Sequence, residues 1–246
     1  MTKIVSSGQL RCGVTLDFPP MGSRDEKNEP AGFDVEYCQD FAKAMGVKPV
    51  IVDVPFADRI PSLASNRTDI VVASTSDTME RALVVGFTVP YSVFKIVVLT
   101  RKGSGIKSYQ SLKGHPVGGT AGTFEGPLLE ADVKKWDDPK GSYRQYQSQA
   151  DLYLAVQQGK IDAALVANTA AYSLVKSGKF PNLEVGGEAP IKPDYTSIVV
   201  KREEYGMLSY LNLFINRQYR SGRFGELWSK WVGGEVPALT DAGVYR

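Results

Sequence analysis

The chain has 246 residues, of which 43% are hydrophobic and 23% are charged, and this length is enough for one large domain or two lobes with separate cores. Its 29 basic and 27 acidic residues leave a net charge of +2, and the basic residues are scattered, so the sequence has no nucleic-acid-binding footprint. No apolar run approaches the roughly 20 residues that span a bilayer.

Strands and helices alternate in the first part of the chain. The predicted strands are 11–16, 49–54 and 69–73, the predicted helices are 34–45 and 57–65, and a polar, hairpin-like loop is predicted at 23–29. The first helix has apolar residues at helical spacing and ends at Gly46. This β-α-β-α-β order predicts a mainly parallel sheet with helices on both faces.

A second block repeats this order. The predicted strands are 93–100, 162–166 and 198–201, a further unit begins at 113–118, and the predicted helices are 149–158, 169–176, 203–221 and 225–232. Crossing points near 91–94 and 190–195 divide the chain. We therefore predict two α/β lobes joined by two strands, with the C-terminal helices returning to the first lobe. The predicted lobes are 1–92 plus 194–246, and 93–193; residues 237–246 are predicted to be a peripheral tail.

The cysteine and histidine content favours neither a metal site nor a catalytic triad. Cys12 falls in a predicted strand and Cys38 on the apolar face of a predicted helix. The favoured interpretation is two buried free thiols, and a single bridge between them is the alternative. His115, in a Lys-Gly-His-Pro turn, is interpreted as polar surface. No metal and no cofactor is expected.

The N-terminus shows no signal peptide. The first three residues run almost at once into Gly8 and the lead-in to a strand. Either the protein is cytosolic, or a leader has been removed and Met1 is not native.

A polar segment directly after the strand at 69–73 is the main candidate for a binding site. Ser74 and Ser76 stand on alternate residues, so they point to the same side of an extended chain. Arg81, five residues further on, can grip a carboxylate through two hydrogen bonds. Strand ends are where rigid scaffolds present polar groups to ligands, so this segment predicts a site for a small anionic molecule.

Short motifs along almost the entire chain resemble one known family. In order they are 10–14 (Leu-Arg-Cys-Gly-Val), 18–21 (Phe-Pro-Pro-Met), 32–36 (Gly-Phe-Asp-Val-Glu), 59–63 (Arg-Ile-Pro-x-Leu), 69–71 (Asp-Ile-Val), 78–81 (Thr-Met-Glu-Arg), 87–91 (Phe-Thr-x-Pro-Tyr), 111–114 (Ser-Leu-Lys-Gly), 122–123 (Gly-Thr) and 159–163 (Gly-Lys-x-Asp-Ala). Each motif alone is weak, but their order and intervals are specific. The chain resembles the extracellular solute-binding proteins of polar amino-acid ABC importers, family 3, also called type II periplasmic binding proteins.

The resemblance implies a fold and a role. The fold is two Rossmann-like α/β lobes joined by a two-strand hinge, with a ligand cleft between them that closes on the ligand. The role is the substrate-binding component of an ABC importer, which captures an amino acid or a related small carboxylate and delivers it to a membrane permease. We therefore expect a periplasmic monomer, without enzymatic activity, whose signal peptide has been removed.

In the first lobe, the resemblance assigns Arg81 to the α-carboxylate of the ligand. Ser76 supports the same group through its hydroxyl and Ser74 largely through backbone groups. The alternative for these serines is an N-cap role, for which Thr78 competes; Asp77 is also expected to favour the N-terminus of a following helix.

The resemblance also implies that aromatic side chains flank the ligand. Phe18 and Phe56 match these positions, and core packing is the alternative for both. Arg59 matches an arginine that, in some relatives, reaches the ligand side chain and favours acidic ligands; the alternative is a surface arginine at a helix start.

In the second lobe, the resemblance places Thr123 and the backbone around Phe124 on the carboxylate, and Thr120 on the ligand side chain. The glycine-rich segment 118–125 opens a helix and suits an anion. Many members carry an aspartate where this chain has Ala167. Since an unpaired buried ammonium costs several kcal/mol, either Asn168, Asp17 or Asp194 binds the amine, or the ligand has no α-amino group.

Two other functions remain open. One is a cyclohexadienyl-dehydratase-like enzyme on the same fold, although Ala167 and Ala170 occupy places where a general acid could stand. The other is the ligand-sensing domain of a larger receptor.

Overall fold

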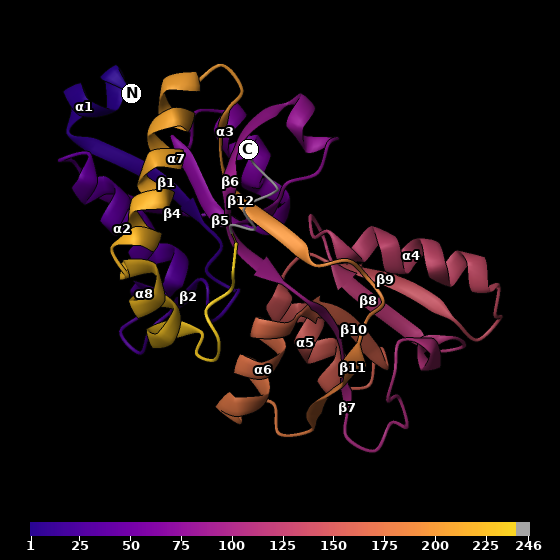
Figure 1. Cartoon of the computed structure of the whole chain (residues 1–246). Helices are drawn as coiled ribbons and strands as arrows, with labels where there is room; N and C mark the ends of the chain where they lie inside the picture. The colour runs from indigo at the N-terminus through magenta and orange to yellow at the C-terminus, as the bar shows by residue number, and fades with distance from the viewer. Residues whose placement is uncertain (240–246) are drawn as a thin grey trace. The chain divides into compact units, whose positions relative to one another are not determined.

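The computed structural model describes residues 1–239. It contains two compact units: Met1–Val93 together with the chain from Tyr195 onward, and Phe94–Asp194 (Figure 1). Each has a five-stranded sheet with helices packed against it, so the predicted α/β class is confirmed. The first unit is called lobe 1 below and the second lobe 2. Residues 240–246 of the predicted tail lie outside the described part of the chain.

The lobe 1 sheet has the order β4-β1-β5-β12-β6. Its strands are β1 (Gln9–Val14), β4 (Lys48–Asp53), β5 (Ile70–Ser76), β6 (Val85–Phe94) and β12 (Asp194–Lys201). β1 pairs in parallel with β4 and β5, whereas β12 runs antiparallel to β5. The sheet is therefore mixed. Its antiparallel strand β12 comes from the part of the chain that follows lobe 2.

The polar loop predicted before the first long helix is a hairpin. The short strands β2 (Ser23–Arg24) and β3 (Pro30–Ala31) pair antiparallel. The helical segments of lobe 1 are α1 (Thr2–Ser7), α2 (Phe33–Ala44), η1 (Phe56–Asp58), α3 (Arg59–Ala64), η2 (Arg81–Leu83), α7 (Tyr205–Arg220) and α8 (Arg223–Trp231). Within residues 1–239, no helix combines the length and apolar character needed to cross a bilayer.

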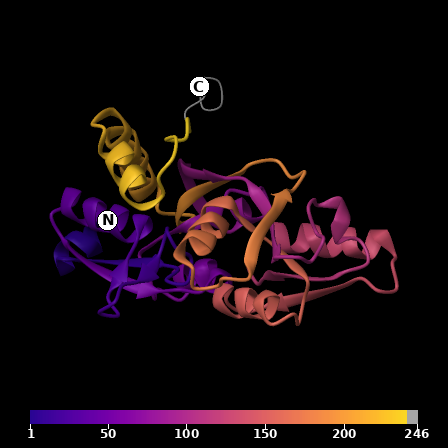
Figure 2. The same cartoon turned by 90° about the horizontal axis from the view of Figure 1, so that it is seen from below.

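Helix α2 is the centre of the lobe 1 core. It begins after Gly32, whose φ is 129° and where an added Cβ would lie 2.4 Å from the backbone oxygen of Met21, so the position requires glycine. Its buried face carries Phe33 and Tyr37, which stack with ring centroids 5.5 Å apart. Helices α7 and α8 pack on this face, where Phe33 meets Phe224 and Tyr37 meets Phe214. Figure 2 shows the C-terminal helices, in yellow, from below. The C-terminal helices thus pack within lobe 1.

Two ion-pair sets fasten α8 to α2. Arg223 donates from Nε to Asp40 Oδ2 at 2.7 Å, and its Nη2 lies 3.5 Å from Glu36 Oε2. Lys230 pairs with Glu36 from the next turns of α8. These ion pairs hold α8 against α2.

The favoured prediction of free thiols is wrong, because Cys12 and Cys38 form a disulfide. Both residues are fully buried, and their Cα atoms are 6.5 Å apart, within the range that a disulfide bridges. Strand β1 and helix α2 pack directly on each other. The sequence places Cys12 in a strand and Cys38 on the apolar face of a helix, but only this packing brings the two residues together.

Removal of the disulfide by Cys12→Ala with Cys38→Ala should lower the free energy of unfolding. The bridge closes a 26-residue separation, for which the chain-entropy relation gives about 3.5 kcal/mol. Urea unfolding with and without a reductant measures this: reduced wild type should approach the double variant, and the variant should not respond to reductant. Two free thiols found on labelling the unreduced, unfolded wild type would contradict the bridge.

The lobe 2 sheet has the order β11-β7-β10-β8-β9. Its strands are β7 (Ile96–Arg101), β8 (Pro116–Thr120), β9 (Ser142–Tyr146), β10 (Ala163–Ala167) and β11 (Leu183–Glu188). Its helical segments are η3 (Gln110–Leu112), α4 (Glu125–Trp136), α5 (Gln149–Gln157) and α6 (Asn168–Ser177). Strand β7 alternates between two cores: Val97 and Leu99 pack with α5 and α6, while Ile96 and Val98 pack with α4.

The sequence missed several elements of this fold. β9 is an edge strand whose residues are polar or half-buried, and β11 contains a bulge at adjacent glycines, so neither carries a strong alternating pattern. β6 (Val85–Phe94) is not predicted as a strand; the strand predicted at 93–100 corresponds to β7 (Ile96–Arg101). The chain passes between the two units at 93/94 and 194/195.

Candidate functional site

The end of β5 contains an irregularity at Ser74. On β12, Ser197 pairs with Thr75 and Val199 with Val71, so the three residues 72–74 of β5 stand opposite Ile198 alone. Ser74 has a φ of 47°, in the left-handed region. A non-glycine residue there needs support from its surroundings. This β-bulge ends two residues before Ser76, a predicted ligand contact.

The polar groups of Ser74 bind inside lobe 1. Its backbone N–H donates to the Tyr91 hydroxyl oxygen at 2.8 Å, and its own hydroxyl donates to Asp34 Oδ2 at 3.4 Å. The Tyr91 hydroxyl in turn donates to Asp34 Oδ1 at 2.8 Å. Ser74 is predicted to bind ligand largely through backbone groups; in this structure its N–H is bonded to Tyr91.

Arg59 also forms hydrogen bonds to the residues of this bulge. It is only 3% exposed. Its Nη1 donates to the carbonyl oxygens of Ala73 and Ser74 at 2.9 and 2.7 Å, and its Nε donates to Phe56 O at 3.0 Å. Three of its hydrogen bonds are therefore to backbone of lobe 1, so the alternative of a surface arginine is wrong. The contact of Arg59 with a ligand side chain stays a prediction.

Asp34 lies in the first turn of α2 and is 1% exposed. Burial raises the pKa of its carboxyl well above the usual value, while hydrogen bonds from Tyr91 and Ser74 and the charge of Arg59 oppose the rise. Asp34 and Tyr91 were not among the predicted site residues. A sequence signal existed for both, since an acidic residue on the apolar face of a helix, and a tyrosine among buried strand residues, each need a polar partner.

Arg81 and Ser76 lie together after the bulge. Arg81 Nη1 is 3.3 Å from the Ser76 carbonyl oxygen, to which it donates, and the arginine side chain is half-buried. The backbone N–H of Arg81 donates to Thr78 Oγ1 at 3.3 Å, but the N-cap residue of η2 is Glu80, so Thr78 does not have the predicted N-cap position. The helix expected here is only the three-residue η2, because the chain enters β6 at Val85.

The two predicted aromatic residues touch each other. The rings of Phe18 and Phe56 meet edge to face with centroids 5.1 Å apart, and both are nearly buried. The guanidinium carbon of Arg59 lies 4.7 Å from the centre of the Phe56 ring. The aromatic pair and the Ser74 bulge are therefore linked through Arg59 within one lobe.

The lobe 2 candidates gather at the C-terminal end of β8. The hydroxyl of Thr123 donates to the Thr120 carbonyl oxygen at 2.8 Å. Thr120 is 3% exposed, and its own hydroxyl has no hydrogen-bond partner among residues 1–239. Phe124 is the N-cap residue of α4. The unpartnered Thr120 hydroxyl is a polar group that a ligand can satisfy.

The glycines before this turn serve packing. A Cβ at Gly118 would lie 2.7 Å from the Arg144 carbonyl oxygen, and one at Gly119 would lie 3.1 Å from the Cα of Gly126. They let β9 and α4 approach β8 closely.

Asn168 begins α6, directly after Ala167. Its side-chain oxygen accepts from the Lys95 N–H at 3.2 Å, and its N–H donates to the Lys95 carbonyl oxygen at 2.8 Å. Ala167 is the buried last residue of β10. Asn168 is thus fixed to the start of β7, and whether it binds an amine stays a prediction.

His115 is more than polar surface. Its Nδ1 lies 2.9 Å from Asp162 Oδ2, and Arg101 Nη2 lies 2.9 Å from Asp162 Oδ1. Partial burial raises the pKa of Asp162, but the His115 and Arg101 hydrogen bonds outweigh it and leave this pKa below its usual value. The aspartate of the Gly-Lys-x-Asp motif therefore links the last residue of β7 to the residue before β8.

Comparison with known proteins agrees with this arrangement. The family described as bacterial extracellular solute-binding proteins, family 3, matches residues 10–234. The chain belongs to this family. The match includes both lobes and every predicted site residue, so the family resemblance inferred from short motifs is confirmed.

Individual relatives of this solute-binding protein cover nearly its whole length. The L-cystine-binding protein TcyJ of Escherichia coli K12 is 29% identical, over 96% of this chain and 87% of its own. A crystal structure of the P235GK mutant of ArgBP from T. maritima superposes with a TM-score of 0.84 at 29% identity, over 95% of this chain and 99% of its own. The fold is therefore that of the type II periplasmic binding proteins.

A third similar structure is the ancestral amino-acid-binding protein AncCDT-1, a precursor of cyclohexadienyl dehydratase. It has a TM-score of 0.82 and 25% identity, over 94% of this chain and 98% of its own. The family fold is thus shared with the ancestor of an enzyme.

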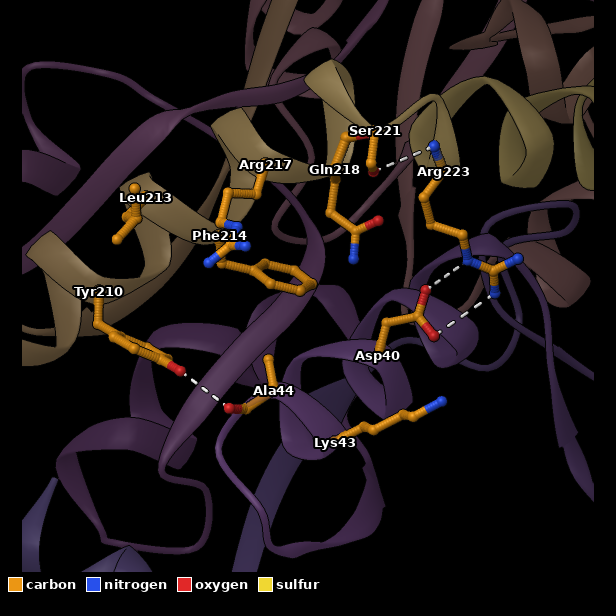
Figure 3. Close-up of a pocket in the computed structure, with 10 residues that line it drawn as sticks. All are labelled: Asp40, Lys43, Ala44, Tyr210, Leu213, Phe214, Arg217, Gln218, Ser221 and Arg223. Carbon is orange, nitrogen blue, oxygen red and sulfur yellow. Dashed lines mark hydrogen bonds and ion pairs between the residues drawn. The ribbon is translucent and has the colours of Figure 1, made fainter.

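The solute-binding protein also has a groove of about 590 Å³ between α2 and α7 (Figure 3). The Asp40–Arg223 ion pair and the Tyr210 hydroxyl, which donates to the Ala44 carbonyl oxygen at 2.9 Å, close two of its sides. It contains none of the residues predicted to bind ligand.

Proposed function

We propose that this protein is the substrate-binding component of an ABC importer, and that it binds an amino acid or a related small carboxylate. The observation that carries the proposal is the family match across residues 10–234. Relatives named for L-cystine and arginine support an amino acid as the ligand class. The membrane partner is then a permease, and no covalent chemistry is required.

We further propose that the ligand is held by both lobes. Arg81 binds the carboxylate with Ser76 in lobe 1, and Thr120, Thr123 and the backbone at Phe124 complete the contacts from lobe 2 as the lobes close. A half-buried arginine beside a serine at a strand end supports the first part. The unpartnered, buried hydroxyl of Thr120 supports the second.

The compartment follows from the family and agrees with the disulfide. Family members are extracellular solute-binding proteins, and the Cys12–Cys38 disulfide suits an oxidising compartment. We propose that this protein acts as a monomer in the periplasm after removal of a signal peptide.

A thermal-shift panel tests the function. It contains the twenty amino acids, L-cystine, and matched carboxylates without the α-amine. A ligand at about one hundred times its dissociation constant adds roughly 2.7 kcal/mol to the stability. Shifts with amino acids would show that the amine has a partner other than residue 167; shifts with only the deaminated acids would make Ala167 the specificity determinant. A panel without any shift, on protein stripped of bound ligand by unfolding and refolding, contradicts the proposal.

The similarity to AncCDT-1 makes a dehydratase the second candidate. Incubation with a cyclohexadienyl carboxylate, monitored for its aromatic product, distinguishes the two. Turnover would favour the enzyme, whereas a melting shift without turnover would favour the binding protein.

A further inference from the structure

We propose that Tyr91 and Asp34 are positioning residues that hold Ser74 in its left-handed conformation and thereby set the direction of Ser76 and Arg81 toward the ligand. This inference rests on the proposed function. It assigns a role to two residues that touch the predicted site only through other residues.

The first step is the backbone. Serine at a φ of 47° is in a region that few non-glycine residues adopt. It stands at the last position of the bulge, and the pairing of β5 with β12 resumes at the next residue, with Thr75 opposite Ser197 and Ser76 opposite Thr196. Relaxing Ser74 to an ordinary extended conformation would change the course of the chain at these pairs. The conformation at Ser74 therefore sets where Ser76 points.

The second step is the set of atoms that fix this conformation. The irregular pairing with β12 leaves the Ser74 N–H free to donate to the Tyr91 hydroxyl oxygen at 2.8 Å. Tyr91 is fully buried, and its hydroxyl donates to Asp34 while it accepts from Ser74. Asp34 also receives the Ser74 hydroxyl. The Asp34 carboxyl group on α2 thus binds the Ser74 hydroxyl directly and the Ser74 backbone N–H through the Tyr91 hydroxyl.

The third step is the link to the ligand contact. The Ser76 carbonyl oxygen accepts a hydrogen bond from Arg81 Nη1. The bulge therefore determines the position of the carbonyl oxygen that holds the Arg81 guanidinium. A bidentate carboxylate contact depends on the plane and position of that guanidinium. A small rotation at Ser74 is therefore expected to change ligand affinity without any lost ligand contact.

The charges around Asp34 are all within lobe 1. Arg59 is the cation that faces it, the phenols of Tyr91 and Tyr37 flank it, and Ser74 completes its surroundings. Asn in place of Asp34 retains an acceptor for the Tyr91 hydroxyl. Asp34→Asn should therefore preserve affinity far better than Asp34→Ala.

Glycine rescue separates positioning from mere stabilisation. Glycine adopts positive φ without support, so Ser74→Gly should remove the need for the Tyr91 hydroxyl. We expect Tyr91→Phe to weaken binding of L-arginine, L-cystine or the strongest panel amino acid about tenfold. In the Ser74→Gly background, the same change should cost less than about twofold. Isothermal titration calorimetry of the four proteins gives this coupling.

The matched control is Tyr109→Phe in lobe 2. Tyr109 is also buried, and its hydroxyl donates to Asp132 at 2.6 Å. Its removal should lower stability without any coupling to Ser74→Gly. Equal affinity losses from Tyr91→Phe with serine or glycine at position 74 would overturn the proposal.

A readout without ligand keeps this inference distinct from the proposed function. In Tyr91→Phe, the ¹³Cα and ¹³Cβ shifts of Ser74 should leave their left-handed values, and its amide proton should exchange faster. If no probe binds wild type, the proposed function fails while these shifts still decide the backbone role. If wild type binds but the shifts and affinity are unchanged in Tyr91→Phe, the positioning role is wrong.

Discussion

Arg81→Ala should weaken amino-acid binding by about 10²–10³-fold, because it removes both hydrogen bonds of the guanidinium fork and leaves the ligand carboxylate unpaired. The fold should remain intact, since Arg81 is only half-buried, its side chain donates to the nearby Ser76 carbonyl oxygen, and its bond to Thr78 is made by its backbone N–H. Titration calorimetry with the amino acid selected in the thermal-shift panel measures the loss.

Two variants sharpen this result. Arg81→Lys keeps the charge but not the planar fork, so it should recover only part of the affinity. Arg202→Ala is the matched control, since Arg202 is an exposed arginine of the same lobe that donates to the Leu83 carbonyl oxygen. It should bind like wild type. Unchanged affinity in Arg81→Ala would remove this residue from the site.

Arg59→Met is expected to have the largest effect on stability. Arg59 is buried, it satisfies the carbonyl oxygens of Ala73 and Ser74, and it faces the buried Asp34. Removal of one partner from such a buried charge set costs about 3–5 kcal/mol, or a fall in melting temperature of about 10 °C for a chain of this size. Denaturant unfolding at neutral pH measures it.

The loss in Arg59→Met should also depend on pH. The charge of Arg59 lowers the pKa of Asp34, so the variant raises this pKa further above its unfolded value. The folded state then prefers the protonated acid; the carboxyl group destabilises the fold increasingly as pH rises through its folded pKa. The difference from wild type should therefore be smallest in acid and grow toward neutral pH. Adding Asp34→Asn to Arg59→Met should abolish this trend, and a pH-independent loss would contradict the assigned pairing.

Much of the architecture follows from local patterns. The helical spacing of Val35, Cys38 and Phe41 predicts α2 to within a residue at each end, because one face of an amphipathic helix must be buried. The motif order predicts the family, which the match over residues 10–234 confirms. The site assignments to Arg81, Ser76 and Thr120 come from that resemblance and stay predictions.

Residues of the second block show where local patterns fail. The strand β9 is polar because it is an edge, and β12 is antiparallel to β5 because it returns from the other unit. Neither fact has a local cause. The Cys12–Cys38 disulfide has the same origin, since it depends on β1 lying against α2.

The sequence by itself determined the class of fold, the order of most helices and strands, and the family, because each depends on periodicity or on short motifs in a fixed order. Only the tertiary structure decided what Ser74, Arg59, Asp34 and Tyr91 do. These residues come from β5, α3, α2 and β6, and a left-handed serine needs partners that no neighbouring residue supplies. Partners far apart in sequence meet only when the sheet and α2 are packed, and hydrogen bonds formed there are determined by the fold rather than by any local pattern.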